Sequence, residues 1–332
     1  MNFLRLLTAI ATGCLLSDLP PAVSAQPRRA AAKIGVLSFG TAPSGANPDP
    51  SAGFRQGLAE LGYVEGRNLR IEWRYAEGRP ERMAALAAEL IQLKVEVLLA
   101  GGPAAIETAR RATAGIPIVA VGGSDPVREG WAQSLARPGG NITGLTATFP
   151  GLSEKHLEFL KEALPGVTRV AVVFAPTELG GKAALMARLE PAARAFGMRL
   201  HALELRGADD LDTAFGRARE AHDEAVYAVA TNLIVTHRAR VAQLANSSRM
   251  VSIGEFPLLA QAGFLLTYGA DLDDLGRRSA TYVDKILKGA RPGDLPIERP
   301  AKFRLIINLR TAKALDLTIP RGLLLRADEV IE

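Results

Sequence analysis

The chain is poor in cysteine, in aromatic residues and, after its first 25 residues, in long hydrophobic runs. Cys14 is the only cysteine among 332 residues, which excludes a disulfide framework, a cysteine-based zinc site and an iron–sulfur cluster. Aromatic residues make up 5% of the sequence, too few for a nucleic-acid surface built on stacked rings. The 40 Lys and Arg are interspersed with 35 Asp and Glu, and no run of five basic residues occurs, so no nucleic-acid partner is expected.

The sequence also lacks the common catalytic motifs. Residues 38–43 stand where a dinucleotide-binding fold would carry Gly-x-Gly-x-x-Gly, and neither a Walker loop nor a Gly-x-Ser-x-Gly elbow is present. The four histidines are far apart and form no His-x-x-x-His pair. The acidic pairs Asp209-Asp210 and Asp273-Asp274 precede or open helices, where carboxylates complement the helix dipole. We therefore predict no cofactor, no metal site and no catalytic residue.

The first 25 residues have the pattern of an export signal. One basic residue lies within residues 1–5, and residues 6–16 are mostly apolar but too few to span a bilayer. Val23-Ser24-Ala25 supplies small residues where a signal peptidase cleaves, so we predict cleavage after Ala25 and a periplasmic protein. The alternative is a lipoprotein anchored at Cys14, although the usual leucine upstream is missing.

The rest of the chain alternates between short apolar runs and amphipathic segments. The predicted strands are residues 33–37, 69–73, 95–100, 116–121, 170–174, 200–205, 225–230, 251–253 and 303–308. The predicted helices are residues 54–61, 182–196, 211–221, 235–245 and 272–288, with others starting at Pro80, Pro103 and Ser153 and a short one near Ala312. Uninterrupted apolar strands separated by such helices indicate parallel sheets covered on both faces. The sequence thus predicts an α/β protein of two similar sheets, joined near residues 141–148.

Polar, glycine-containing turns follow successive predicted strands. In open α/β sheets the loops at the carboxyl ends of the strands line the ligand crevice. Gly102-Pro103 places free backbone N–H groups at a helix start, which either bind an anion or form an ordinary helix entry. Asp125 before Pro126 either binds an amine or makes an Asx turn, and Tyr268 either stacks on a ligand or fills a hinge.

These turns give the predicted ligand-binding residues. They are Ser38, Phe39, Thr41, Gly102, Pro103, Ala104, Ser124, Asp125, Thr177, Thr231, Asn232, Glu255, Phe256 and Tyr268.

Several longer motifs resemble one family, the exported solute-binding proteins of ABC transporters that are similar to tryptophan-binding proteins. The motifs are Phe54-Arg55-Gln56-Gly57-Leu58, Glu60-Leu61-Gly62-Tyr63-Val64-Glu65-Gly66, Ala76-Glu77-Gly78-Arg79-Pro80-Glu81-Arg82, Asp125-Pro126-Val127, Leu135-Ala136-Arg137-Pro138-Gly139-Gly140-Asn141-Ile142-Thr143-Gly144, Tyr282-Val283-Asp284-Lys285-Ile286-Leu287-Lys288-Gly289-Ala290 and Ile307-Asn308-Leu309-Arg310-Thr311-Ala312-Lys313-Ala314-Leu315. The resemblance extends through nearly the whole chain after the signal.

The resemblance implies a type I periplasmic-binding fold, with two doubly wound Rossmann-like lobes joined by a hinge of several crossovers. It places residues 33–145 and about 270–298 in the first lobe, and residues 146–267 and about 301–332 in the second. It further implies a monomer that captures a small, carboxylate-bearing solute, with aromatic and amino-acid-like molecules among the candidates, and delivers it to an ABC permease in the inner membrane.

Two departures from the family pattern bear on the ligand. Ala175-Pro176 replaces a frequent Asn-Pro, and Thr231-Asn232 replaces a frequent Asp-Pro, which removes one acid that would hold a ligand ammonium on the second lobe. These departures leave open a solute other than an aromatic amino acid. The alternatives are a Rossmann-type oxidoreductase, which the missing phosphate motif disfavours, and a ligand-sensing protein without a transport role. A transcriptional regulator would need an N-terminal helix-turn-helix, where this chain has a predicted signal peptide.

Overall fold

The computed structural model describes residues 31–43, 51–123, 125–147, 149, 151–175, 181–229 and 231–332. The predicted signal peptide, its cleavage site and the alternative anchor at Cys14 lie outside the described residues. Among the described residues, no helix is both long enough and apolar enough to cross a membrane.

The first lobe is built on a five-stranded parallel sheet in the order β2-β1-β3-β4-β5. Its strands are β1 (Ala32–Ser38), β2 (Leu69–Tyr75), β3 (Val97–Gly101), β4 (Ile118–Gly123) and β5 (Ile142–Thr146). Strands β1, β3 and β4 carry runs of fully buried apolar side chains, as expected of strands covered by helices on both faces. The strand order reverses between β1 and β3, and such a switch point opens a crevice at the carboxyl ends of the strands.

The second lobe repeats this order and extends it. Its strands are β6 (Arg169–Phe174), β7 (Arg199–Glu204), β8 (Ala225–Ala228), β9 (Val251–Gly254), β10 (Leu266–Ala270), β11 (Phe303–Asn308) and β12 (Glu329–Ile331). The order β7-β6-β8-β9-β10 matches the first sheet, and β11 and β12 follow at the β10 edge. Because β11 runs antiparallel to β10, the second sheet is mixed, and at seven strands it is larger than the first. The expectation of two similar, purely parallel sheets is corrected in these two respects.

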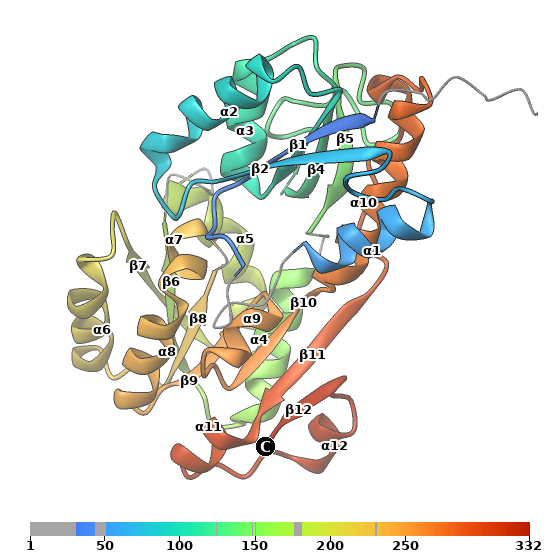
Figure 1. Ribbon diagram of the computed structural model, residues 1–332. Coiled ribbons are helices and arrows are strands. Elements are labelled where there is room, and N and C mark those ends of the chain that lie inside the picture. The colour runs from blue at the N-terminus through green and yellow to red at the C-terminus, as the bar shows by residue number, and fades with distance from the viewer. Residues whose placement is uncertain are drawn as a thin grey trace, which may run out of the picture. The chain divides into compact units, whose positions relative to one another are not determined.

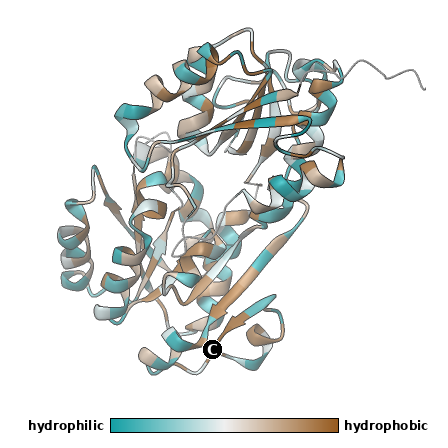
Figure 2. Cartoon of the chain, in the orientation of Figure 1, coloured by the Kyte–Doolittle hydropathy of each residue, from teal (hydrophilic) through white to brown (hydrophobic). Residues whose placement is uncertain are grey.

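Helices cover the faces of both sheets (Figure 1). They are α1 (Ala52–Glu60), α2 (Met83–Gln92), α3 (Pro103–Ala112), α4 (Leu152–Ala163), α5 (Gly181–Ala195), α6 (Asp210–Glu220), α7 (Asn232–Thr236), α8 (Arg238–Ser247), α9 (Pro257–Gln261), α10 (Leu272–Leu287), α11 (Leu309–Ala314) and α12 (Arg321–Leu324), with short 3-10 turns at Pro80–Arg82 and Pro292–Asp294. Figure 2 shows the hydrophobic residues concentrated in the strands. Each sheet has one apolar cluster on each of its faces.

Helix α10 follows a strand of the second sheet yet packs on the first sheet, beside α1 (Figure 1). Asp271 caps it by accepting hydrogen bonds from the backbone N–H groups of Asp273 and Asp274, at 3.0 and 3.1 Å. Glycine allows the two helices to approach closely, since a Cβ at Gly57 would lie 2.5 Å from the carbonyl oxygen of Arg277. The chain then returns to the second sheet through β11.

Three segments therefore connect the two lobes: the chain after β5, the link from β10 to α10, and the link from α10 to β11. The first and third segments are hydrogen-bonded to each other. The N–H of Glu298 donates to the carbonyl oxygen of Gly144, and the N–H of Thr146 donates to the carbonyl oxygen of Glu298. The residue limits of the lobes remain a prediction.

Several elements differ from the sequence-based expectation. The expected junction at residues 141–148 contains strand β5, and the expected helix at residues 235–245 is two helices that meet at His237. Helices α9 and α12 and strand β12 were not expected. All three are at most five residues long, too short to produce a recognisable hydrophobic period.

Candidate functional site

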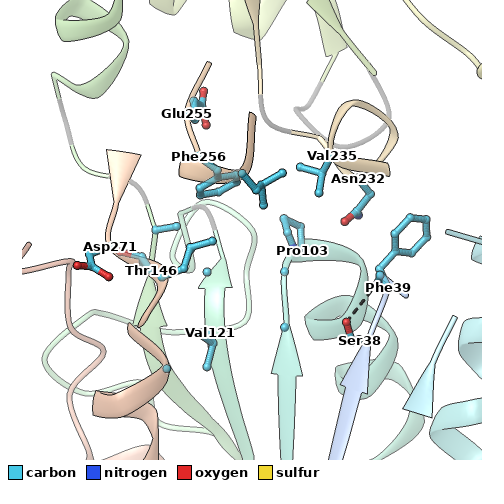
Figure 3. A pocket seen from close by; sticks show the side chains of 18 of the residues that line it. Ser38, Phe39, Pro103, Val121, Thr146, Asn232, Val235, Glu255, Phe256 and Asp271 are labelled. Atoms are coloured by element: carbon cyan, nitrogen blue, oxygen red, sulfur yellow. Dashed lines mark hydrogen bonds between the residues drawn. The ribbon is translucent and has the colours of Figure 1, made fainter. Parts of the chain in front are cut away.

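A cavity of about 810 Å³ is lined by residues from both lobes and from the segments that connect them. This volume lies within the range of small-molecule sites, roughly 300–1,000 Å³. The cavity lies at the carboxyl ends of β1, β3, β4, β8 and β9, as the rule for open α/β sheets predicts. Figure 3 shows Phe39 and Pro103 of the first lobe opposite Asn232 and Val235 of the second.

Most of the predicted ligand-binding residues line this cavity. Those that do are Ser38, Phe39, Thr41, Gly102, Pro103, Asp125, Thr231, Asn232, Glu255 and Phe256. Ser124 and Thr177 lie outside the described residues. Ala104 packs against the first-lobe core instead.

Tyr268 was expected to stack on a ligand or to fill a hinge, and it is not among the residues that line the cavity. Its ring packs against Phe159 of α4 and Phe303 of β11, with centroid distances of 4.8 and 5.8 Å. Successive side chains of a strand point to opposite faces, so Tyr268 faces α4 while its neighbours face the other way. A ligand in the cavity is therefore not expected to touch this ring.

Aromatic side chains are gathered at the cavity. Six of them line it, Phe39, Phe54, Trp73, Tyr75, Phe149 and Phe256, in a sequence that contains only 11 Phe, 5 Tyr and 2 Trp. The rings of Trp73 and Tyr75 are nearly parallel, with a centroid distance of 6.1 Å and an angle of 4°. The guanidinium of Arg55 lies 4.5 Å from the centroid of the Trp73 ring and makes a cation–π contact with it. The cavity thus offers flat apolar surfaces for an aromatic or aliphatic group.

Glu255 places a buried acid at the second-lobe wall of the cavity. Its side chain lies at the end of β9 and the residue is 9% exposed. The hydroxyl of Tyr227 donates to Oε1 at 2.8 Å, and Oε2 has no hydrogen-bond partner among the described residues. Because a buried carboxylate is costly without partners, an oxygen left open to the cavity favours a ligand that donates hydrogen bonds. Glu255 thus supplies an acid to the same cavity in which Thr231-Asn232 replaces a frequent one.

The Tyr227 hydroxyl also contacts His156 of α4, and both residues are fully buried. The Tyr227 hydroxyl lies 3.1 Å from Nδ1 of His156, and Nε2 lies 2.6 Å from the carbonyl oxygen of Tyr268. Burial lowers the pKa of His156 and raises the pKa of Tyr227 well above its usual value, the charge of Glu255 adding to the rise for the tyrosine. Tyr227 therefore keeps its proton at physiological pH.

Arg188 of α5 supplies a positive charge at the same wall. It is exposed, and within the described ranges its guanidinium has neither a hydrogen bond nor an ion pair. Its charge lowers the pKa of His156, an effect smaller than burial and opposed by Glu255. An unpaired guanidinium in a cavity is suited to a carboxylate, which it can bind through two parallel hydrogen bonds.

Several helices begin at residues that line the cavity, among them α3 in the first lobe and α4 beyond the first crossover. Gly102 precedes α3 with a φ of 80°, a conformation that favours glycine, and a Cβ there would lie 3.8 Å from Oδ1 of Asn232. Asp125 makes the Asx turn, because its Oδ1 accepts from the N–H groups of Val127 and Arg128, each at 3.1 Å. Oδ1 of Asp125 therefore already accepts two backbone hydrogen bonds.

The sequence analysis did not identify several lining residues. Trp73 and Tyr75 share one face at the carboxyl end of β2, a strand end that the rule used for the other strands also covers. Arg188 lies in the middle of a helix, where no turn or motif distinguishes it from the other arginines of the chain. Among the described residues, no group of three or more His, Cys, Asp or Glu could hold a metal ion.

The family model for ABC transporter substrate binding proteins matches residues 33–331. The chain belongs to this family. A tyrosine-binding protein of Clostridioides difficile is 26% identical to this substrate-binding protein over 265 residues, which cover 80% of this chain and 76% of that protein. A conserved domain protein of Vibrio cholerae is 29% identical, with a TM-score of 0.82, 90% of this chain covered and 99% of that chain.

An ABC domain from Streptococcus pneumoniae, solved in complex with L-Trp, also has a TM-score of 0.82. It is 23% identical, and the match covers 91% of this chain and 100% of that chain. The substrate-binding protein thus has the type I periplasmic-binding fold, with two doubly wound lobes, as its sequence motifs predicted. The family consists of solute-binding proteins, so the cavity is the candidate solute site.

Proposed function

We propose that this substrate-binding protein captures an amino acid with an aromatic side chain in its cavity. The observation that carries the proposal is the presence of three complementary groups in one cavity: the open oxygen of Glu255, the unpaired guanidinium of Arg188 and the aromatic side chains. Glu255 would accept from the ligand ammonium, Arg188 would bind the carboxylate, and the rings would cover the side chain. The tyrosine-binding protein and the L-Trp complex among its relatives support the same ligand class.

Capture requires that the ligand favours a closed arrangement of the lobes. The lining residues come from both lobes, so a ligand that contacts both gains more in the closed state than in the open one. A micromolar Kd corresponds to about −8 kcal/mol. Two charge-assisted contacts and the burial of one aromatic ring suffice for this. The chain itself then supplies no covalent chemistry, and the solute leaves unchanged.

We further propose that the protein is exported, with cleavage after Ala25, and delivers its solute to an ABC permease in the inner membrane. Anchoring through Cys14 is the alternative route to the same compartment. Residues 1–25 have the three parts of a secretory signal in the correct order, which supports export. N-terminal sequencing of the secreted protein distinguishes a start at Gln26 from a modified Cys14.

A titration of the purified mature protein tests the ligand class. Isothermal titration calorimetry with L-tyrosine, L-tryptophan and L-phenylalanine should give a Kd in the micromolar range or tighter for at least one of them. L-Leucine and glutarate should bind at least about tenfold more weakly, because one loses the ring contacts and the other the ammonium. Tighter binding of leucine or glutarate than of all three aromatic amino acids would contradict the proposal, as would conversion of the ligand to a product.

A further inference from the structure

A chain of hydrogen-bonding groups runs from the cavity wall into the second-lobe core. It begins at Glu255, passes through the Tyr227 hydroxyl and the His156 imidazole, and ends at the carbonyl oxygen of Tyr268, with successive distances of 2.8, 3.1 and 2.6 Å. Tyr227 and His156 are fully buried, so no solvent can replace a missing partner. Strand β10 supports both ends, since Gly269 lies against the backbone of Glu255 and a Cβ there would come 1.6 Å from its carbonyl oxygen.

The two ends of this hydrogen-bonded chain, Glu255 and the carbonyl oxygen of Tyr268, determine how many protons it holds. A carbonyl oxygen only accepts, so the hydrogen bond to Tyr268 requires a proton on Nε2 of His156. An ionised Glu255 also only accepts, so the single hydroxyl proton of Tyr227 goes to Oε1. In a neutral His156 the Nδ1 atom then carries only a lone pair. No proton lies between Nδ1 and the Tyr227 oxygen, so these two atoms form no hydrogen bond. One additional proton, held on His156 as an imidazolium whose Nδ1–H donates to the Tyr227 oxygen, completes all three bonds.

The groups around the chain determine when that proton binds. Glu255 from β9 favours the imidazolium, whereas burial and Arg188 from α5 oppose it, and burial is the largest effect, so the pKa of His156 is lowered. Ser153, on α4 like His156, hydrogen-bonds to the Tyr227 hydroxyl. The charged groups facing the Tyr268 side chain are Lys155 and Glu158 of α4, together with Arg326 and Asp328 after α12. Burial thus keeps His156 neutral at neutral pH, so the hydrogen-bonded chain lacks its third proton there and gains it only as the pH falls below the usual range of a histidine.

We propose that Tyr227 and His156 are positioning residues that hold Glu255 toward the cavity, and that their shared proton competes with the ammonium group of the ligand. Without the proton, Glu255 and its partners carry a net negative charge that attracts an ammonium. With the proton, the chain is neutral and this attraction is lost. This inference rests on the proposed function, because it requires a ligand that places a cation at Glu255. Because of this competition, the affinity for the ligand should be high at neutral pH and lower in an acidified compartment.

The test measures the Kd of an aromatic amino acid and of its deaminated analogue from about pH 7.5 down to about pH 5, because burial lowers the pKa of His156 below its usual value. L-Tryptophan and indole-3-propionate form one such pair, and L-tyrosine and 3-(4-hydroxyphenyl)propionate form another. For the amino acid, the Kd should rise on acidification, with a limiting slope of about tenfold per pH unit for one proton. For the analogue, which has the carboxylate but no ammonium, the Kd should stay level or fall, since the added proton increases the positive charge near Arg188.

Two variants separate this role from a purely structural one. His156→Gln removes the titrating ring and should give an amino-acid Kd that no longer depends on pH in this window. Tyr227→Phe keeps the His156 ring but removes the hydroxyl that connects it to Glu255, so it should also reduce the slope. His201→Gln is the matched control, because His201 pairs with Asp223 at 2.8 Å and does not line the cavity, so the wild-type slope should persist. Circular dichroism at each pH verifies that the variants are folded.

The outcomes separate this inference from the function on which it rests. If no aromatic amino acid binds at any pH, the proposed function fails. If the amino acid binds but its Kd is independent of pH, or if His156→Gln retains the wild-type slope, the proton in this chain has no role in capture. Calorimetry in two buffers of different ionisation enthalpy provides a second readout. Wild-type protein should release protons on binding the amino acid at the acidic end of this pH range, and it should not release them on binding the analogue.

Discussion

At the scale of single residues, Arg188 lines the cavity with a guanidinium that has no ion pair or hydrogen bond among the described residues. Arg188→Gln should weaken binding of a carboxylate ligand by about tenfold to a hundredfold, since a hydrogen bond to a charged group contributes about 1.5–3 kcal/mol. Calorimetry with the best ligand of the panel measures the change. Thermal stability should remain close to wild type, because the Arg188 side chain makes no hydrogen bond or ion pair within the described ranges.

Arg194→Gln is the control for this prediction. Arg194 lies on the same helix, pairs with Glu190 at 3.3 Å and does not line the cavity. An exposed ion pair of this kind contributes about 0–1 kcal/mol to stability, and its loss should leave the Kd unchanged. Equal affinity losses in the two variants would mean that Arg188 acts through the general charge of the helix and does not contact the ligand.

The sequence was informative for those site residues whose position is determined by the backbone. Gly102, Asp125 and Glu255 follow strand ends, and the chain direction alone brings such ends together at one edge of a sheet. The position of Arg188 depends on how α5 packs against its sheet, which no local pattern encodes. The hydrogen-bond partners of His156 likewise lie on two strands, β8 and β10, far from it in the sequence, so its role was not visible before the fold.

At the scale of elements, the contact between α1 and α10 links the start of the first lobe to a helix more than 200 residues later. Gly57→Ala should destabilise the protein by about 1–3 kcal/mol, since its Cβ would lie 2.5 Å from a backbone oxygen and 2.8 Å from the Cβ of Ala280. Chemical denaturation measures the loss. The two helices would have to separate, because neither neighbour is a flexible side-chain end.

Gly216→Ala provides the comparison within the same protein. Gly216 lies inside α6, and a Cβ there would meet only the end of the Arg219 side chain, at 3.8 Å. Alanine in a helix interior is more favourable than glycine by about 0.5–1 kcal/mol, so this variant should be neutral or stabilised. A similar loss of stability in both variants would show that the close approach of α1 and α10 is not the cause.

The elements were predictable where a hydrophobic period is long and uninterrupted. The strand at residues 170–174 and the helix at residues 272–288 agree with β6 and α10 to within one residue at each end. Strand β5 was missed because Thr143 and Gly144 interrupt its apolar run, and Gly144 is required there, since a Cβ would lie 2.0 Å from the carbonyl oxygen of Ala120. The antiparallel pairing of β11 with β10 depends on the detour of the chain through α10, which is a property of the whole path.

At the scale of the whole molecule, ligand capture should change the fluorescence of one tryptophan and leave that of the other nearly unchanged. Trp73 lines the cavity, whereas Trp131 packs in the first-lobe core, at 7% exposure. In a Trp131→Phe variant, L-tyrosine or L-phenylalanine should cause a saturable change in emission excited near 295 nm, because the ligand and the approaching second lobe replace water beside Trp73. The reciprocal Trp73→Phe variant retains only Trp131 and should show little change. The midpoint in Trp131→Phe should equal the calorimetric Kd, and a saturable signal from Trp131 alone would place the ligand at a site other than this cavity.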